Sequence, residues 1–234
     1  MPLAGGFLQH GYQCGLVWGA ALAAGAEAHR RYGTGPAAHT AALLAARRTV
    51  ESFETRHGTV NCLEITDLDK DSSAWKMIRV FLLQGKTIGC LRMASWFAPL
   101  ALEAIESSLD EIDETPDPPV SCAAVVVREM GGSDLHEAMA AGLAGGIGLC
   151  GGACGALGAA IWMRGLNRGE EEGKQKLSFK HPADLATIER FLARTDYEFE
   201  CAKIVGRTFE DVRDHAAYLR QGGCAELLEA LATD

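Results

Sequence analysis

The chain carries an internal duplication built on glycine and cysteine. The segment GGFLQHGYQCG at residues 5–15 aligns with GGIGLCGGACG at residues 145–155, 140 residues later. Further along, VNC at 60–62 aligns with FEC at 199–201, and the Gly-Cys pair at 89–90 aligns with the pair at 223–224. A repeat of this length indicates two structural units that share one fold. The recurring cysteines are Cys14, Cys62 and Cys90 in the first copy and Cys154, Cys201 and Cys224 in the second.

An acidic, proline-rich stretch separates the two copies. We place the first copy at residues 1–110, the second at 120–234, and the linker at 107–119 (SSLDEIDETPDPP). Proline lacks the N–H that a helix interior needs, so this stretch cannot continue a helix. The second copy also contains Cys122, for which the first copy has no counterpart.

The segments between the glycine-rich turns have helical patterns. Apolar residues recur near the 3.6-residue period at 37–55 and 88–109, and shorter helices are expected at 184–193 and 224–232. The run Val125 to Val127 is β-like but too short to carry a sheet. We therefore predict an all-α fold in which two pseudo-repeated halves pack together, with the four tryptophans in the core. These are Trp18, Trp75, Trp96 and Trp162.

Charge and hydropathy favour a soluble protein. The net charge of −9 leaves no footprint for nucleic acid or for an anionic membrane surface. Residues 138–163 are uncharged and long enough to span a bilayer, but eight of them are glycine. The matching part of the first copy contains Gln9, His10, Tyr12 and Gln13, which suit a membrane core poorly. We expect no membrane association, and no basic signal segment precedes the first copy, which points to the cytoplasm.

The eight cysteines can serve as metal ligands or as redox-active thiols. Taken singly, a buried free cysteine is usually a small apolar side chain, but packing needs no sulfur at three matched positions. Cys122 with the three second-copy cysteines gives four thiols, the usual complement for tetrahedral zinc or an iron–sulfur cluster. His10 aligns with Cys150, and Cys150 lies four residues before Cys154, so His10 and Cys150 are possible additional ligands.

Several other chemistries have no support in the sequence. No GxGxxG follows a strand and no phosphate-binding GKS/T is present, so no nucleotide site is expected. The absence of CxxCH excludes covalent c-type haem. The charged residues 170–176 are interpreted as a solvated turn.

The order of these residues resembles the C_GCAxxG_C_C family of redox-active proteins. The resemblance rests on Cys122, on Cys154-Gly155-Ala156, on Cys201 and on Cys224, with a glycine run at 145–148 before them. Two features depart from the family pattern: Ala159 stands where a final glycine is expected, and the first copy lacks the leading cysteine. The resemblance implies a redox role, and a related domain in split-Soret-type cytochromes suggests an iron–sulfur cluster.

Three hypotheses follow. The leading one is one-electron transfer through a cluster held by Cys122, Cys154, Cys201 and Cys224, with a second site on Cys14, Cys62 and Cys90. The second is a metal-free thiol–disulfide protein, which needs an accessible thiol of low pKa. The third is a zinc-stabilised scaffold or an accessory subunit of a transporter. The sequence identifies no redox partner, and its glycine-lined helix faces are compatible with a homodimer.

Overall fold

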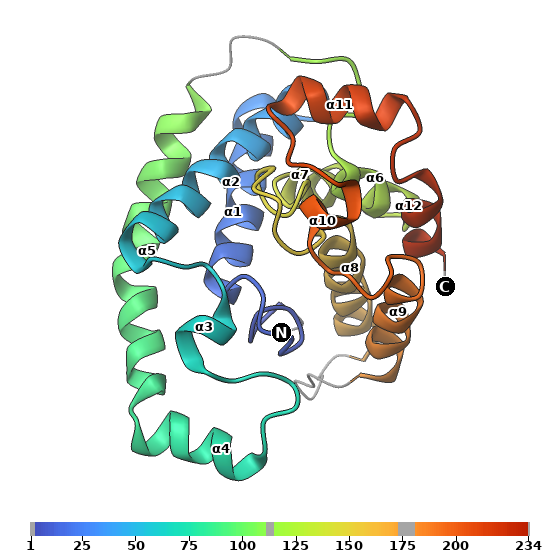
Figure 1. The fold of residues 1–234 in the computed structure, drawn as a ribbon. Coiled ribbons are helices and arrows are strands. Elements are labelled where there is room, and N and C mark those ends of the chain that lie inside the picture. The colour runs from blue at the N-terminus through green and yellow to red at the C-terminus, as the bar shows by residue number, and fades with distance from the viewer. Residues whose placement is uncertain (1–2, 111–114, 173–180, 234) are drawn as a thin grey trace.

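The computed structural model describes residues 3–110, 115–172 and 181–233, and in these ranges it is helical without a named strand (Figure 1). The fold is therefore all-α, as predicted. The helices are α1 (Gly15–Tyr32), α2 (Pro36–His57), α3 (Cys62–Thr66), α4 (Ala74–Ile78), η1 (Arg79–Leu83, a π-helix), α5 (Lys86–Leu109), α6 (Cys122–Glu129), α7 (Asp134–Ala141), α8 (Gly155–Glu172), α9 (Pro182–Leu192), α10 (Cys201–Val205), α11 (Val212–Arg220) and α12 (Ala225–Ala232).

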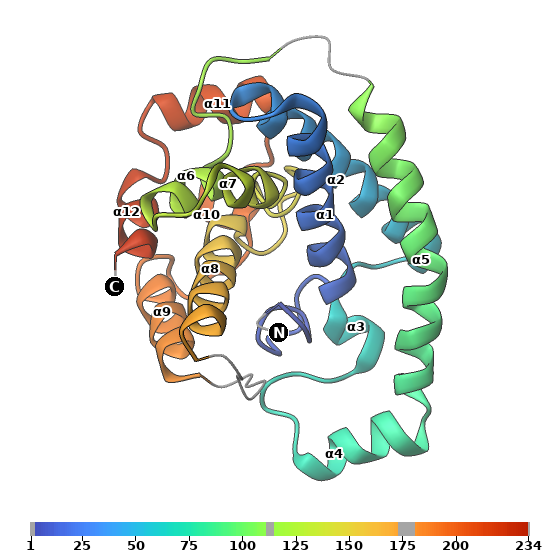
Figure 2. The ribbon, with the colours of Figure 1, turned by 180° about the vertical axis from the view of Figure 1, so that it is seen from behind.

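The two halves meet along α1 and α7. In the first half α1 packs on α2 and α2 packs on α5, while in the second half α6 packs on α7 and α8. Helix α5 lies along one side of the molecule, and α9 and α12 lie along the opposite side (Figures 1 and 2). Close packing is possible because the meeting helices are rich in alanine and glycine. A Cβ on Gly25 would lie 2.1 Å from the carbonyl oxygen of Ala138 in the other half.

The four helices expected from the sequence are all present as α2, α5, α9 and α12, and their ends differ from the expected ones by at most two residues. The β-like run 125–127 lies in α6, because the helix buries Val126 and Val127 against the core and so overrides the local preference for strand. Helix α5 continues to Leu109, so the segment between the halves starts later than the expected linker at 107. Residues 111–114 and 173–180, which include parts of the expected linker and charged turn, lie outside the described residues.

Both copies contain a left-handed turn at the same place. Residues 5–9 and 145–149 each have five consecutive positive φ angles, a conformation that costs an L-residue roughly 1–2 kcal/mol. A side chain at Gly146 would collide with Gly152, whose backbone nitrogen lies 2.3 Å from the Cβ position. These turns explain why glycine recurs in the duplication. They also break residues 138–163 into α7, a turn and α8, so no membrane-spanning helix forms there.

Two tryptophan positions show how far the core prediction holds. Trp18 is fully buried, and its indole N–H donates to the Gln13 carbonyl at 3.1 Å. Trp75 is 69% exposed, so its expected place in the core is wrong. The reason is that α4 packs on η1 at the edge of the molecule and buries none of its own residues.

Candidate functional site

Matched backbone hydrogen bonds bring two cysteines together in each copy. In the first copy the Cys14 N–H donates to the Val60 carbonyl, and the Cys62 N–H donates to the Tyr12 carbonyl, both at 2.7 Å. The equivalent bonds in the second copy run from Cys154 to Phe199 and from Cys201 to Gly152, also at 2.7 Å. Each pair surrounds an isolated antiparallel bridge, Gln13 with Asn61 and Ala153 with Glu200. The duplication is thus also a structural one.

Most of these cysteines lie at helix N-termini. Cys14 and Cys224 are the N-cap residues of α1 and α12, Cys154 directly precedes α8, and Cys122 is the first residue of α6. Free N–H groups and the positive end of the helix dipole favour negative charge at such positions. Three of these thiols accept backbone hydrogen bonds: Cys14 from Leu16, Cys122 from Gly145 and Ala123, and Cys154 from Ala156 and Leu157.

The four second-copy cysteines line one small cavity of about 20 Å³, which has room for about one water molecule. They reach it from four separate elements: the starts of α6, α8, α10 and α12. Cys122 and Cys154 are buried, while Cys201 and Cys224 are partly exposed. Apolar and aromatic side chains form most of the remaining wall, and the buried imidazole of His215 also lines it, with its Nδ1 at 2.9 Å from the Val120 carbonyl oxygen. The apolar and aromatic residues are Ile204, Val205, Phe209, Tyr218, Leu219, Leu227 and Leu228.

The three first-copy cysteines line a larger cavity of about 300 Å³. Cys14 is buried and Cys62 and Cys90 are partly exposed, and they come from α1, α3 and α5. Polar groups of Gln9, Thr66 and Asp69 share the wall. Each cavity is therefore lined by the cysteines of one copy, and the first-copy cavity is the larger of the two.

Two predicted additional ligands lie elsewhere. Cys150 is exposed and follows the left-handed turn, so it is not on a helix face with Cys154, and it does not line the four-cysteine cavity. The ring of His10 packs 4.8 Å from the ring of Phe199, and burial lowers the pKa of His10. His10 lines neither cysteine cavity.

Sequence reasoning missed Tyr218. Its hydroxyl lies 3.6 Å from the Cys224 sulfur, and burial together with that contact raises the pKa of Tyr218 to about 12. The phenol is therefore protonated at neutral pH, and either its O–H or the thiol can donate in this contact. No local pattern in the sequence indicated the contact, which also requires glycine at 223, since a Cβ there would lie 2.2 Å from the Tyr218 ring.

Burial keeps the thiols protonated. It raises the pKa of Cys154 and of Cys14 to about 11, against the opposing effect of backbone hydrogen bonds. The pKa values of Cys122 and Cys201 are raised further, first by burial and then by the neighbouring cysteines. A thiol of this kind is a poor nucleophile at neutral pH, because the thiolate is the reactive form.

These directions predict the pH dependence of the metal-free protein. The pKa of a buried thiol is higher in the folded chain, about 11, than in the unfolded chain, about 9. Its contribution to the free energy of unfolding is therefore fully present below pH 9 and is lost as pH rises toward 11. We expect the midpoint of urea unfolding to rise between pH 6 and 8, because burial lowers the pKa of His39 and of His215 to about 4, so that the unfolded chain binds more protons than the folded one. The midpoint should then fall between pH 9 and 11. Alkylation by iodoacetamide should accelerate over the same range. Rapid alkylation of Cys154 at pH 7, mapped by mass spectrometry, would contradict this assignment.

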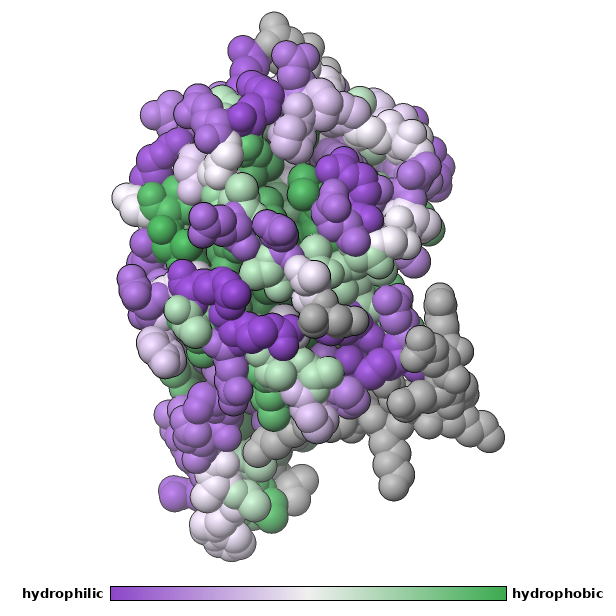
Figure 3. Space-filling model, turned by 90° about the vertical axis from the view of Figure 1, so that its right-hand side faces the viewer, coloured by the Kyte–Doolittle hydropathy of each residue, from purple (hydrophilic) through white to green (hydrophobic). Residues whose placement is uncertain are grey.

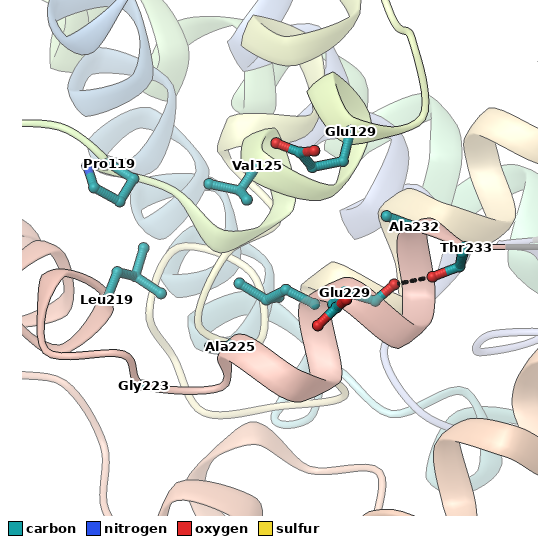
Figure 4. A pocket seen from close by; sticks show the side chains of 10 residues that line it. Pro119, Val125, Glu129, Leu219, Gly223, Ala225, Glu229, Ala232 and Thr233 are labelled. Carbon is teal, nitrogen blue, oxygen red and sulfur yellow. Dashed lines mark hydrogen bonds between the residues drawn. The ribbon is translucent and has the colours of Figure 1, made fainter.

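An apolar groove lies against the four-cysteine cavity. It has a volume of about 480 Å³ and runs between α6 and α12 (Figure 4). The groove and the cavity share Leu219 and Leu228 as a common wall. Helix α12 lies on the right in Figure 1, and on the side seen in Figure 3 hydrophobic patches interrupt the hydrophilic surface. Only one layer of residues thus separates the cysteines from this groove.

Comparison with known proteins gives one match. The family model described as "Putative redox-active protein (C_GCAxxG_C_C)" matches residues 1–101 and 120–233. No curated protein and no solved structure matches the chain. The two matched segments each contain one set of grouped cysteines.

Proposed function

The chain belongs to the C_GCAxxG_C_C family of redox-active proteins, and on that premise we propose that it transfers single electrons through an iron–sulfur cluster. The ligands would be Cys122, Cys154, Cys201 and Cys224. The observation that carries the proposal is that these four thiols, from four separate elements, line one small, largely apolar cavity. A reducing compartment such as the cytoplasm belongs to the proposal, because it keeps the thiols available.

The four thiols are chemically suitable ligands for an iron–sulfur cluster, but they must move before a cluster can fit between them. Four thiols are a complete ligand set for a cluster, and Cys122 and Cys154 already accept backbone hydrogen bonds. Among the described residues no three His, Cys, Asp or Glu side chains stand close enough to hold one metal ion. The cavity is also small. Loading therefore requires the wall to rearrange, and the short α10 and the start of α12 carry the two partly exposed cysteines.

When bound, an iron–sulfur cluster supplies a one-electron couple. The residues around the cavity determine how such a cluster would bind and how easily it would be reduced. Cys122 and Cys154 must each release a proton, so loading is favoured by rising pH. Backbone N–H groups of Gly145, Ala156 and Leu157 donate to sulfur and stabilise negative charge there, which favours the reduced state. Phe209, Leu227 and Leu228 exclude water from the sulfurs.

The first-copy cavity offers a less complete site. Cys14, Cys62 and Cys90 supply three thiols, and the remaining wall offers Asp69 and Thr66 as oxygen donors. The Asp69 carboxylate already accepts from the Ser72 hydroxyl at 2.8 Å. A group held here by three sulfurs would have an open position, so we propose that this site is the weaker of the two.

The test is the loading of the protein purified without oxygen. We expect broad absorption between about 320 and 460 nm, which bleaches on reduction, together with matching amounts of iron and acid-labile sulfide. A colourless protein without iron, even after reconstitution with iron and sulfide, overturns the proposal.

Zinc is the second candidate, because the small cavity favours a single ion over a cluster. It predicts one zinc per four-cysteine site and no redox signal. A metal-free disulfide cycle is less favoured, since its nucleophile would need a lowered pKa and burial raises the pKa of Cys154. A change in free-thiol count between oxidised and reduced metal-free protein would support that cycle.

A further inference from the structure

Exposed apolar side chains gather on one segment of the molecule. Twelve large hydrophobic residues are exposed among the described residues, and eight of them lie between residues 74 and 102. This segment comprises α4, η1 and most of α5, and we name it the α4–α5 surface. The eight are Trp75, Ile78, Phe81, Leu83, Ile88, Leu91, Leu100 and Leu102.

The same segment is basic within an acidic chain. Residues 74–102 contain Lys76, Arg79, Lys86 and Arg92 and no acidic residue, although the whole chain has a net charge of −9. Two of these cations have partners: Lys76 lies 3.3 Å from the Asp67 carboxylate, and Lys86 donates to the Ile65 carbonyl. Arg79 and Arg92 are exposed. The whole-chain charge therefore conceals a local positive surface.

The apolar residues of α5 are split between two faces. Met93, Phe97, Ala101 and Ile105 are buried on the face toward the core, where α5 packs on α2. The outer face carries Ile88, Leu91 and Leu102, spaced by helical turns. By length and composition α5 is the one described helix that could cross a membrane. Because its inner face is already packed in the protein, the outer face is the part left for another surface.

We propose that the α4–α5 surface binds the face of an anionic phospholipid membrane, with the helices lying in the interface rather than crossing it. The combination of basic side chains with exposed Trp and Leu is typical of helices that insert their apolar side chains at the headgroup level. Trp75, at 69% exposure, and Leu83, at 74%, are placed to enter first. Arg79 and Arg92 would meet the lipid phosphates.

A second copy of the chain fits this surface less well. A two-fold dimer through the α4–α5 surface would bring the same basic residues together, and residues 74–102 hold no carboxylate to neutralise them. Anionic lipid complements the charge directly. The surface also adjoins the first-copy site, since Met77, Phe81 and Cys90 line that cavity. Membrane binding itself does not depend on the identity of any metal in the protein.

The experiment is sedimentation of the full-length protein with vesicles. We expect it to bind phosphatidylglycerol–phosphatidylcholine vesicles at 50 mM salt, to bind pure phosphatidylcholine poorly, and to be released by 500 mM salt. The variant Arg79→Glu/Arg92→Glu should lose at least about tenfold in lipid affinity. Leu83→Ser/Leu91→Ser should lose binding even at low salt.

The matched control is Leu185→Ser/Arg194→Glu, on α9 and in the turn that follows it, which removes one exposed leucine and one exposed arginine from another part of the molecule. It should bind as the parent does. Circular dichroism and unfolding curves check that every variant is folded. Absence of binding to anionic vesicles overturns the proposal, as does equal binding by the parent and both surface variants. A dimer in sedimentation velocity that only the surface variants dissolve would assign this surface to a second copy instead.

Discussion

Replacing Cys201 with serine is expected to empty the four-cysteine cavity. Cys201 is held against Cys154 by the paired backbone bonds, and serine keeps these while removing the soft sulfur donor. Protein prepared without oxygen should lose the iron and sulfide bound at this site, retaining at most what the first copy holds. We measure iron, acid-labile sulfide and the visible spectrum of the parent and of Cys201→Ser.

The control is Cys150→Ser. Cys150 belongs to the same copy but is exposed and does not line the cavity, so iron content should be unchanged. If both variants retain the parent's iron, the ligand assignment is wrong. If both lose it, the turn before Cys154 matters to loading and Cys150 must be reconsidered as a ligand. Far-ultraviolet circular dichroism separates loss of metal from loss of fold.

The second large effect concerns the left-handed turn. Gly146→Ala should destabilise the protein by roughly 4 kcal/mol, at the upper end of single-residue effects. Gly146 has φ +76°, and an added Cβ would lie 2.3 Å from the Gly152 nitrogen and 2.4 Å from its oxygen. The Gly146 carbonyl also accepts from the buried Gln13 side chain at 3.2 Å, and Gln13 in turn accepts from the Ala153 N–H at 3.1 Å, so this side chain helps to join the two copies. Urea unfolding of the metal-free protein measures the change.

Gly206→Ala separates strain from collision. Gly206 is left-handed, with φ +80° and ψ 3°, but nothing lies within 4 Å of its Cβ position, so only the conformational cost of roughly 1–2 kcal/mol applies. The expected difference between the two variants is therefore about 2–3 kcal/mol. Equal destabilisation would show that the backbone approach at Gly146 relaxes freely.

Much of the helical layout follows from the sequence because it depends on local patterns. The periods at 37–55 and 88–109 correspond to α2 and α5, and Pro182 starts α9 as expected. Local preference failed at Val125 to Val127, where burial in α6 outweighs the β-propensity of valine. The prediction that Trp75 lies in the core was also wrong. Tryptophan is usually buried, but the local sequence does not show that α4 lies at the edge of the molecule.

The sequence alone determined the duplication and the grouping of the cysteines, because a repeated order of glycines and cysteines requires two units with the same turns. It did not reveal the left-handed conformation at 145–149, which includes the non-glycine residues Ile147 and Leu149 and in which Gly148 packs against the backbone of the distant Arg47. The tertiary structure alone decided that one cysteine cavity is small and the other large, and that Cys150 lies apart from its neighbour Cys154. These features depend on how α1, α7 and the short helices pack, and packing joins residues that no local pattern connects.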